Sequence, residues 1–373
     1  MKPGKAIVAG GSVGGLFAAV LLARVGWEIV VYERSSSGLS GKGAGLVPQI
    51  EVGDILREIG QEDVLNSGVV AHERIFLNRA GEIVRTVPVP QAQMSWDLLF
   101  NAFRSQLSEG EYKSGKTVVE VASHDHHVEV RLSDGSHDAA DLLVGADGIG
   151  STVRAYVAPG TAPRFAGYAA FRGLSSEALL PAQSAAILSD RFTFYDAPCM
   201  QFLGYTVAGP DGSTVAGRRR YNWVWYRSLD ESQLDRALTS DHGVRRSYSA
   251  PPLGLSTSTL KDLTESAAAL LPTVVSEVIA KERAPFVQAI FDYEAPELVR
   301  DRVVLLGDSA FVVRPHTAMG VSKAAGDAMM LRDALVAAPN LNEALRAYAR
   351  ERNRVGALIA SYGRRLGASF AGC

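Results

Sequence analysis

The chain has 373 residues, a length that usually divides into more than one domain. Its formal net charge of -2 excludes the basic excess that a general nucleic-acid binder needs. The two cysteines, Cys199 and Cys373, supply neither a disulfide framework nor a CxxC pair for zinc, so a reducing cytoplasm is expected. The apolar stretches near the N-terminus are too short to span a membrane.

The first residues predict a βαβ unit. Residues 5–9 are short, apolar and followed by glycines, which indicates a buried parallel strand. A helix is predicted over 14–25 and a second strand over 28–32. After this unit we expect helices over 51–59 and 96–107, hairpins over 75–89 and at the Asp134-Gly135 turn after 116–132, and a buried strand over 141–145.

The second half of the chain changes character. Residues 166–230 are rich in aromatic and β-branched residues and predict an antiparallel sheet, with 221–226 as its clearest strand. The remaining elements are a helical stretch over 262–282, a buried strand over 302–306, and helices over 320–337 and 341–368.

This order predicts an α/β fold in two interleaved domains. A Rossmann-like nucleotide-binding domain is expected over 1–72, 95–165 and 285–340. An antiparallel-sheet substrate domain over 73–94 and 166–284 interrupts it, and 341–373 form a C-terminal helical segment. The helix over 341–368 is expected to pack on the nucleotide domain or on a second subunit, which leaves a homodimer open.

The first motif is the glycine loop Gly10–Gly15, in which Ser12 stands where the middle glycine of GxGxxG belongs. Gly10 allows the tight turn, and Gly15 allows close helix–strand packing. Serine is small enough for the backbone to approach a pyrophosphate at the helix N-terminus. Glu33 ends the second strand, where a carboxylate accepts ribose hydroxyls, so FAD or NAD is favoured over NADP at this loop.

Two further motifs place a carboxylate at the end of a buried strand. One is Asp147-Gly148 after Leu142–Gly145, followed by Arg154, and the other is Gly307-Asp308 after Val303–Leu306. Open α/β sheets bind ligands at the carboxyl ends of their strands, so both motifs are candidate cofactor contacts.

In this order and spacing, the three motifs resemble the para-hydroxybenzoate hydroxylase family of single-component FAD-dependent aromatic hydroxylases. The resemblance implies an FAD site in which Asp308 binds the ribityl chain and the loop after Pro315 lies along the flavin. The FAD-binding residues expected from the motifs and the resemblance are Gly10, Ser12, Val13, Gly14, Gly15, Glu33, Arg34, Gly45, Gln49, Asp147, Gly148, Arg154, Asp308, Pro315, Ala318, Met319, Gly320 and Val321. Backbone N–H groups near Met319–Val321 are expected to face the pyrimidine edge.

A branch of this family, the 2,6-dihydroxypyridine 3-hydroxylases, is similar in further segments: Tyr32–Ser35, Ala166–Tyr168 with Phe171–Gly173, Arg314–His316 with Ala318, and the serine of the first glycine motif. The chain departs from the wider family at Phe311, where a histidine is usual, and at Ser322, where an asparagine is usual. It also lacks the arginine expected near Trp96, so Arg34, Gln49 or backbone groups are expected to contact the phosphates.

The resemblance implies an NADH- or NADPH-consuming monooxygenase that transfers one oxygen atom to an electron-rich aromatic or N-heteroaromatic ring through a flavin hydroperoxide. Its partners are a small aromatic substrate and oxygen, with no nucleic acid and no membrane. His316, beside Pro315 at the flavin edge, is the candidate general base, with packing in the loop as the alternative role. An aromatic substrate pocket is predicted from Tyr195, Phe202, Tyr205 and Trp223, with sheet packing as the alternative.

A histidine cluster and an arginine run each allow a structural and a functional interpretation. His124, His126 and His127 lie beside a hairpin turn, where a solvated surface is favoured over metal binding, so no metal is expected. Arg218–Arg220 are either a solvated loop or a docking site for NAD(P)H phosphates. An FAD-dependent oxidoreductase that inserts no oxygen, and a non-catalytic FAD-binding redox sensor, remain the alternative functions.

Overall fold

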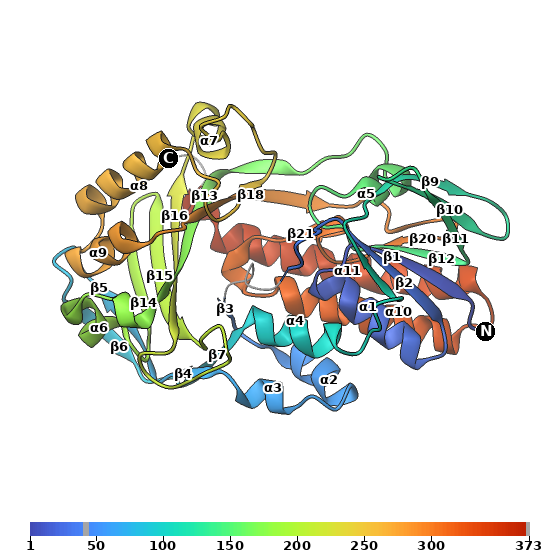
Figure 1. Cartoon of the computed structure of the whole chain (residues 1–373), viewed down its shortest axis with the longest axis horizontal. Coiled ribbons are helices and arrows are strands. Elements are labelled where there is room, and N and C mark those ends of the chain that lie inside the picture. The colour runs from blue at the N-terminus through green and yellow to red at the C-terminus, as the bar shows by residue number, and fades with distance from the viewer. Residues whose placement is uncertain (40–44, 371–373) are drawn as a thin grey trace.

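The computed structural model describes residues 1–39 and 45–370, which form two lobes joined by several crossings of the chain (Figure 1). The N-terminal βαβ unit consists of β1 (Lys5–Ala9), α1 (Val13–Arg24) and β2 (Glu28–Glu33). β1 pairs in parallel with β2, and both strands are largely buried, as their continuous apolar sequence predicts.

β1 and β2 belong to a six-stranded sheet in the right-hand lobe of Figure 1. Its order is β19 (Val299–Arg300), β20 (Val303–Leu305), β12 (Leu142–Gly145), β1, β2 and β8 (Tyr112–Ser114). β1 is followed in the chain by β2 on one side and later flanked by β12 on the other, so the strand order reverses beside β1. Such a switch point opens a crevice at the carboxyl ends of the strands.

Helices cover both faces of this sheet. α1 packs against α4 (Trp96–Arg104) and α10 (Gly320–Ala337), and α10 packs against α2 (Ile50–Glu58) and the long α11 (Leu341–Leu366). On the other side lie α5 (Thr152–Val157) and a small sheet of β9 (Val118–Ser123), β10 (Val128–Leu132) and β11 (His137–Ala140). Asp134-Gly135 lies in the β10–β11 turn, as predicted.

The left-hand lobe is built on a large, mostly antiparallel sheet. Its strands run in the order β17 (Ser249–Ala250), β18 (Phe286–Glu294), β13 (Arg164–Ser176), β16 (Arg220–Ser228), β15 (Met200–Val207), β14 (Arg191–Ala197), β5 (Glu73–Leu77) and β6 (Ile83–Val87), with β21 (Phe311–Val312) beside β18. A smaller sheet of β3 (Gly45–Leu46), β7 (Gln91–Ser95) and β4 (Val69–Ala71) contacts β15 of the large sheet and α4.

Helices cover one face of the large sheet: α6 (Ala182–Leu188), α8 (Thr257–Leu270) and α9 (Thr273–Lys281) (Figure 1). α7 (Glu231–Leu238) and α3 (Asp63–Asn66) are peripheral. The single helical stretch expected over 262–282 is two helices, because Pro272 is the N-cap of α9 and its ring cannot continue α8. The division of the chain at residue 285 stays a prediction; β18, which follows it, pairs with β13 of the large sheet.

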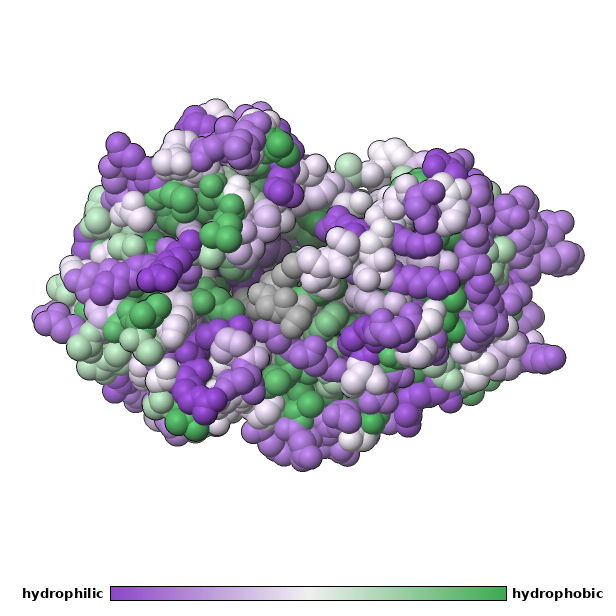
Figure 2. Space-filling model, in the orientation of Figure 1, coloured by the Kyte–Doolittle hydropathy of each residue, from purple (hydrophilic) through white to green (hydrophobic). Residues whose placement is uncertain are grey.

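The C-terminal helix packs within the chain. α11 runs along α10 and β18, and the short helix η4 (Ala368–Phe370) ends against the large sheet, where Ser228 Oγ donates a 2.9 Å hydrogen bond to the Phe370 carbonyl. The space-filling view shows an indentation between the lobes (Figure 2). Among the helices that the structure describes, none has both the length and the apolar character that crossing a bilayer requires.

Candidate flavin and substrate site

A cavity of about 1330 Å³ lies between the lobes. Pockets for a single drug-sized ligand have volumes of about 300–1,000 Å³, so this larger cavity is suited to a dinucleotide together with a second small molecule. The cavity wall contains these predicted cofactor residues: Ser12, Val13, Gly14, Gly45, Gln49, Gly148, Asp308, Pro315, Ala318, Gly320 and Val321.

The glycine loop brings the start of α1 to one end of the cavity. A Cβ on Gly15 would lie 1.9 Å from the Gly10 carbonyl oxygen, and a Cβ on Gly10 would lie 2.3 Å from that of Ala146. Only glycine therefore allows this close approach of helix and strands. Ser12 is the N-cap, yet its side chain makes no capping bond among the described residues, and the first turn of α1 holds no acid. The free N–H groups favour an anion here.

The Glu33 carboxylate stabilises the glycine loop. Its two carboxylate oxygens accept hydrogen bonds from the Gly11 and Ser35 backbone N–H groups, each at 2.8 Å. Glu33 is buried and lies outside the cavity wall, while the Arg34 side chain is exposed. The contact of either residue with FAD stays a prediction. Glu33 also shapes the phosphate loop through its hydrogen bond with Gly11, a role that the sequence pattern alone does not indicate.

The Asp147-Gly148 motif is also organised from within the protein. Asp147 accepts hydrogen bonds from Ser151 Oγ and from the Thr152 and Val153 N–H groups at the start of α5. Burial raises the pKa of Asp147, and these donors oppose the rise. Arg154 is buried and donates to the carbonyls of Ile149 and Ser309, so it joins this motif to the Gly307-Asp308 turn.

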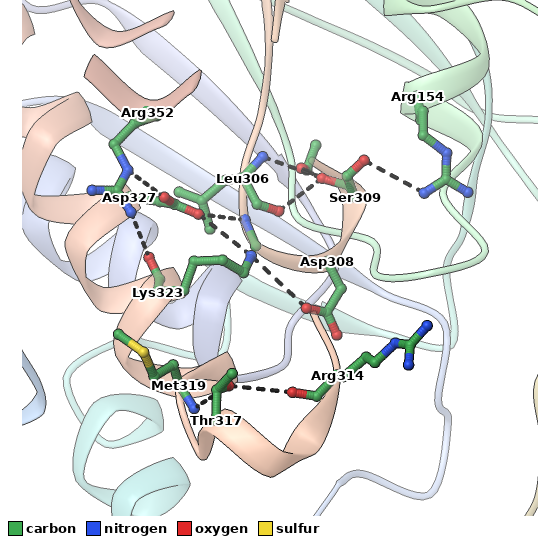
Figure 3. Close-up of polar contacts among 12 residues, drawn as sticks. Arg154, Leu306, Asp308, Ser309, Arg314, Thr317, Met319, Lys323, Asp327 and Arg352 are labelled. Carbon is green, nitrogen blue, oxygen red and sulfur yellow. Dashed lines mark hydrogen bonds and ion pairs between the residues drawn. The ribbon is translucent and has the colours of Figure 1, made fainter. Parts of the chain in front are cut away.

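The third motif rests on a buried network of charges (Figure 3). Asp308 points into the cavity with 52% of its side chain exposed, and enclosure between the lobes raises its pKa. Behind it, Lys323 is fully buried, with Nζ 3.9 Å from Asp308 Oδ1 and 3.8 Å from Asp327 Oδ2. Asp327 also accepts from Arg352 Nε at 2.5 Å and from the Gly307 N–H at 2.9 Å. The network fixes the turn that presents Asp308.

The flavin loop leads into α10. Pro315–Thr317 form a 3-10 turn, and Ala318 follows with φ 54°, a left-handed conformation that a side chain makes unfavourable. The Met319 N–H donates to Thr317 Oγ1 at 3.1 Å, and its contact with a flavin stays a prediction. Gly320 and Val321, in the first turn of α10, line the cavity, where helix N–H groups lack carbonyl partners. Gln49 Nε2 donates to the Thr317 and Ala318 carbonyls and so supports the loop.

His316 lies in an aromatic cluster. Its ring stacks on Phe370 with centroids 5.0 Å apart, packs against Tyr226 at 4.4 Å, and shares a 3.0 Å hydrogen bond between Nε2 and the Tyr168 hydroxyl. Burial, aided by the Arg314 charge, lowers the pKa of His316 to about 4. The imidazole is therefore neutral near pH 7 and a weak base, which favours the packing role over general-base catalysis. Pro315 lies beside it in the cavity wall.

Of the four aromatic residues predicted for the substrate pocket, the structure places only Tyr205 in the cavity wall, and its contact with a substrate stays a prediction. Tyr205 lines the cavity and its hydroxyl donates to the Gly45 carbonyl at 2.9 Å. Tyr195, Phe202 and Trp223 do not line it; they are buried in the main core. Successive side chains of a strand point to opposite faces, and the cavity face instead presents these residues of β13–β18: Arg172, Phe192, Phe194, Leu203, Val224, Tyr226, Phe286 and Gln288.

The triple arginine is neither a solvated loop nor an open phosphate site. Arg219 is buried against Glu177 and Asp190, and buried Arg220 donates to Ser95 and Asp97. Arg218, which is exposed, pairs with Asp211. Since each arginine already has an acidic partner, docking of NAD(P)H at this segment loses its basis.

The histidines of the β9–β10 turn lie at the surface, and none of them lines the cavity. His124, His127 and Glu129 bring one ligand atom each within 4.8 Å of one another, and His127 Nε2 lies 3.2 Å from Glu129 Oε1. The group is largely exposed, as expected for a solvated hairpin.

Two departures from the family pattern, Phe311 and Ser322, are buried side chains. Phe311 is buried and packs on α11 at Gly356, where a Cβ would lie 2.5 Å from the ring. Ser322 is buried on α10, and its hydroxyl has no partner among the described residues. Trp96 lines the cavity and stacks on Phe100 with centroids 5.0 Å apart.

Taken together, these features fit FAD. The glycine cradle and the start of α1 suit a pyrophosphate, the half-exposed Asp308 carboxylate suits a ribityl hydroxyl, and the start of α10 suits the electron-rich edge of a flavin. The large sheet supplies an apolar face for a ring beyond it.

Comparison with known proteins supports this interpretation. The chain matches a sequence family described as FAD binding domain over residues 4–171 and 264–361, and one described as FAD binding domain-like over residues 165–292. It is 30% identical to 2,6-dihydroxypyridine 3-monooxygenase of Paenarthrobacter nicotinovorans, across 91% of this chain and 85% of that protein. The chain belongs to the FAD-dependent aromatic hydroxylases.

Further relatives of this hydroxylase agree. It is 26% identical to 6-hydroxynicotinate 3-monooxygenase of Bordetella bronchiseptica, across 88% of this chain and 82% of that protein. The solved structure of 2,6-dihydroxypyridine-3-hydroxylase from Arthrobacter nicotinovorans superposes with a TM-score of 0.92 at 28% identity, covering 99% of this hydroxylase and 93% of that chain. The predicted fold, with its Rossmann-like lobe, antiparallel sheet and C-terminal helix, is confirmed.

Proposed function

We propose that this hydroxylase uses FAD, oxygen and NADH or NADPH to hydroxylate a small, electron-rich aromatic or N-heteroaromatic ring, such as a hydroxypyridine or a phenol. The observation that carries the proposal is one cavity that joins the phosphate loop, Asp308 and an aromatic sheet face with polar anchors. The names of the relatives, which act on dihydroxypyridine and hydroxynicotinate, support the substrate class.

FAD, when bound, supplies electron transfer from NAD(P)H and the activation of oxygen. The protein binds and orients it. Ser12–Gly14 and the α1 N-terminus would hold the pyrophosphate, Asp308 would accept a ribityl hydroxyl, and the first turn of α10 would stabilise negative charge at the flavin edge. Gly148, Pro315 and Ala318 would shape the wall around it.

The large sheet positions the substrate and excludes water. Val224, Leu203 and Phe286 form an apolar floor, and Tyr226 and His316 close one side. Because His316 is neutral and hydrogen-bonded to Tyr168, we assign it a positioning role rather than proton abstraction.

A screen of hydroxylated pyridines and phenols tests the proposal. In an oxygen electrode, the holoenzyme with NADH or NADPH should consume oxygen faster when a member of the panel is present, and the product should be heavier by one oxygen atom. Product formation without added oxygen mass would instead establish an oxidoreductase without oxygen insertion. The absence of any stimulated turnover would favour the redox sensor.

Cellular location and assembly are part of the proposal. NAD(P)H is held inside cells, which supports a cytoplasmic enzyme. A homodimer is supported only by the outer face of α11, where Leu358 is 61% exposed. Analytical ultracentrifugation of the holoenzyme decides between monomer and dimer.

A further inference from the structure

The substrate half of the cavity contains an arginine, Arg172, that has no role in the function proposed above. Arg172 lies on β13, between Val224 of β16 and Phe286 of β18 in the register of the sheet. Two positions earlier on β13, Ala170 pairs with Tyr226 and with Gln288. The side chains that line the cavity are those of Arg172, Val224, Phe286, Tyr226 and Gln288. Arg172 therefore stands in the middle of the substrate floor.

The guanidinium of Arg172 has few partners. Its NH1 donates to Gln288 Oε1 at 3.3 Å, and its central carbon lies 5.6 Å from the Phe286 ring centroid. The Nε atom is buried without a hydrogen-bond partner, and no carboxylate lies within ion-pair distance of Arg172, among the residues that the structure describes. A buried donor without a hydrogen-bond partner lowers the stability of the fold and is uncommon, which indicates that a ligand accepts a hydrogen bond here.

The groups around Arg172 do not neutralise it. Tyr205 and Tyr226 are protonated, because burial raises the pKa of Tyr205 to about 12 and that of Tyr226 further. Arg74, also in the cavity wall, adds a second cation whose Nε is buried and whose NH2 donates to Gln91 at 2.6 Å. Asp196 also lines the cavity, where it is exposed and accepts a hydrogen bond from Gln201, and no ion pair joins it to Arg172 or Arg74 among the described residues. The substrate floor thus carries unbalanced positive charge.

We propose that Arg172, supported by Gln288, binds an anionic oxygen on the aromatic substrate, either a carboxylate or a ring oxygen that has released its proton to water. This inference rests on the proposed function and narrows its substrate class. A guanidinium presents a planar set of donors that matches such an oxygen and fixes the direction of the ring. It also favours the ionised ring, which is the better nucleophile, so the site needs no strong base at His316.

The test measures ligand affinity in the FAD-loaded enzyme through the change in flavin fluorescence. The ligand pair is 6-hydroxynicotinate and 6-hydroxynicotinamide, which differ in charge at one substituent. The variants are Arg172→Gln and Arg172→Lys. The matched control is Arg227→Gln, which removes an arginine of the same sheet that pairs with Asp262 and does not line the cavity.

We expect Arg172→Gln to weaken binding of the carboxylate about 10- to 100-fold and that of the amide by less than about threefold, because a hydrogen bond to a charged group contributes this difference. Arg172→Lys should fall between the two, and Arg227→Gln should leave both affinities unchanged. Equal losses for both ligands, or a wild-type enzyme that binds both equally, would overturn the assignment.

A pH arm separates the two sources of the anion. If the ring oxygen is recognised, 2,6-dihydroxypyridine should bind more tightly as its hydroxyl ionises, and Arg172→Gln should abolish that slope. If the carboxylate is recognised, binding of 6-hydroxynicotinate should be flat between pH 6 and 9 while Arg172→Gln still weakens it. Failure of the proposed function is distinguishable, because then no aromatic compound, charged or neutral, would accelerate NAD(P)H oxidation. A wild-type enzyme that turns over only neutral aromatics would refute the role of Arg172 alone.

Discussion

Removal of the Asp327 carboxylate should destabilise the whole cofactor side of the cavity. Asp327 is 2% exposed in its side chain, accepts from Arg352 Nε at 2.5 Å and from the Gly307 N–H at 2.9 Å, and lies 3.8 Å from Lys323 Nζ. Asp327→Ala would leave two cations and one backbone N–H buried without this acceptor. Breaking a buried ion pair from one side costs about 3–5 kcal/mol.

This magnitude corresponds to a measurable shift in melting temperature. An unfolding entropy of about 2.1 cal/mol/K per residue gives roughly 0.8 kcal/mol/K for the chain, so Asp327→Ala should lower the Tm by about 4–6 °C. The Gly307 turn would also loosen, and the affinity for FAD should fall because Asp308 loses its support. Differential scanning fluorimetry and flavin titration measure the two effects.

The comparison variants make the outcome specific. Asp333 lies on the same helix as Asp327, and its side chain is 62% exposed. The Asp333→Ala variant should therefore change the Tm by less than about 1 °C. Asp327→Ala combined with Arg352→Met should recover part of the loss, since the stranded cation is removed as well. If Asp327→Ala and Asp333→Ala have the same Tm, the buried network does not support the Gly307 turn.

Four other changes have defined outcomes. Gly15→Ala should abolish FAD binding, measured as flavin content after purification, because its Cβ would lie 1.9 Å from the Gly10 carbonyl oxygen. Ser12→Gly should keep FAD affinity within about tenfold, since the Ser12 hydroxyl makes no capping bond among the described residues. For His316 the folded pKa of about 4 lies below the unfolded value of about 6.5, so its titration lowers stability as the pH falls from 6.5 to 4. His316→Gln should therefore remove up to about 3 kcal/mol of acid destabilisation in denaturant titrations and leave the pH profile of hydroxylation unchanged between pH 6 and 9. Phe370→Ala should admit bulkier rings in a substrate panel without loss of FAD, because Phe370 packs on His316 at the substrate end. Unchanged selectivity in that variant would show that η4 does not bound the pocket.

The fold was predictable because its signals are local. Glycines at fixed spacing, an apolar strand on each side and carboxylates after later strands all survive in a single sequence, and the structure brings Ser12, Gly148 and Asp308 to one cavity. Sequence could not show that Glu33 and Asp147 turn inward to backbone N–H groups, because those contacts depend on the exact course of the loops.

The substrate floor was harder to predict. Alternation along β14–β16 separates two sets of side chains, but both faces of the sheet are covered, one by helices and one by the cofactor lobe. Trp223 and Phe202 are as hydrophobic as Tyr226 and Leu203, so composition does not tell which set faces the cavity. Arg172, a charge on the cavity face, is isolated in the sequence and becomes informative only when the described residues are seen to place no carboxylate within ion-pair distance of it.

The most direct test of the account is turnover under ¹⁸O₂ with NADH or NADPH and the panel aromatic that stimulates oxygen consumption most. The product should carry one ¹⁸O atom on a ring carbon, and the other oxygen atom should leave as water. A product without ¹⁸O, with all consumed oxygen recovered as hydrogen peroxide, would contradict it.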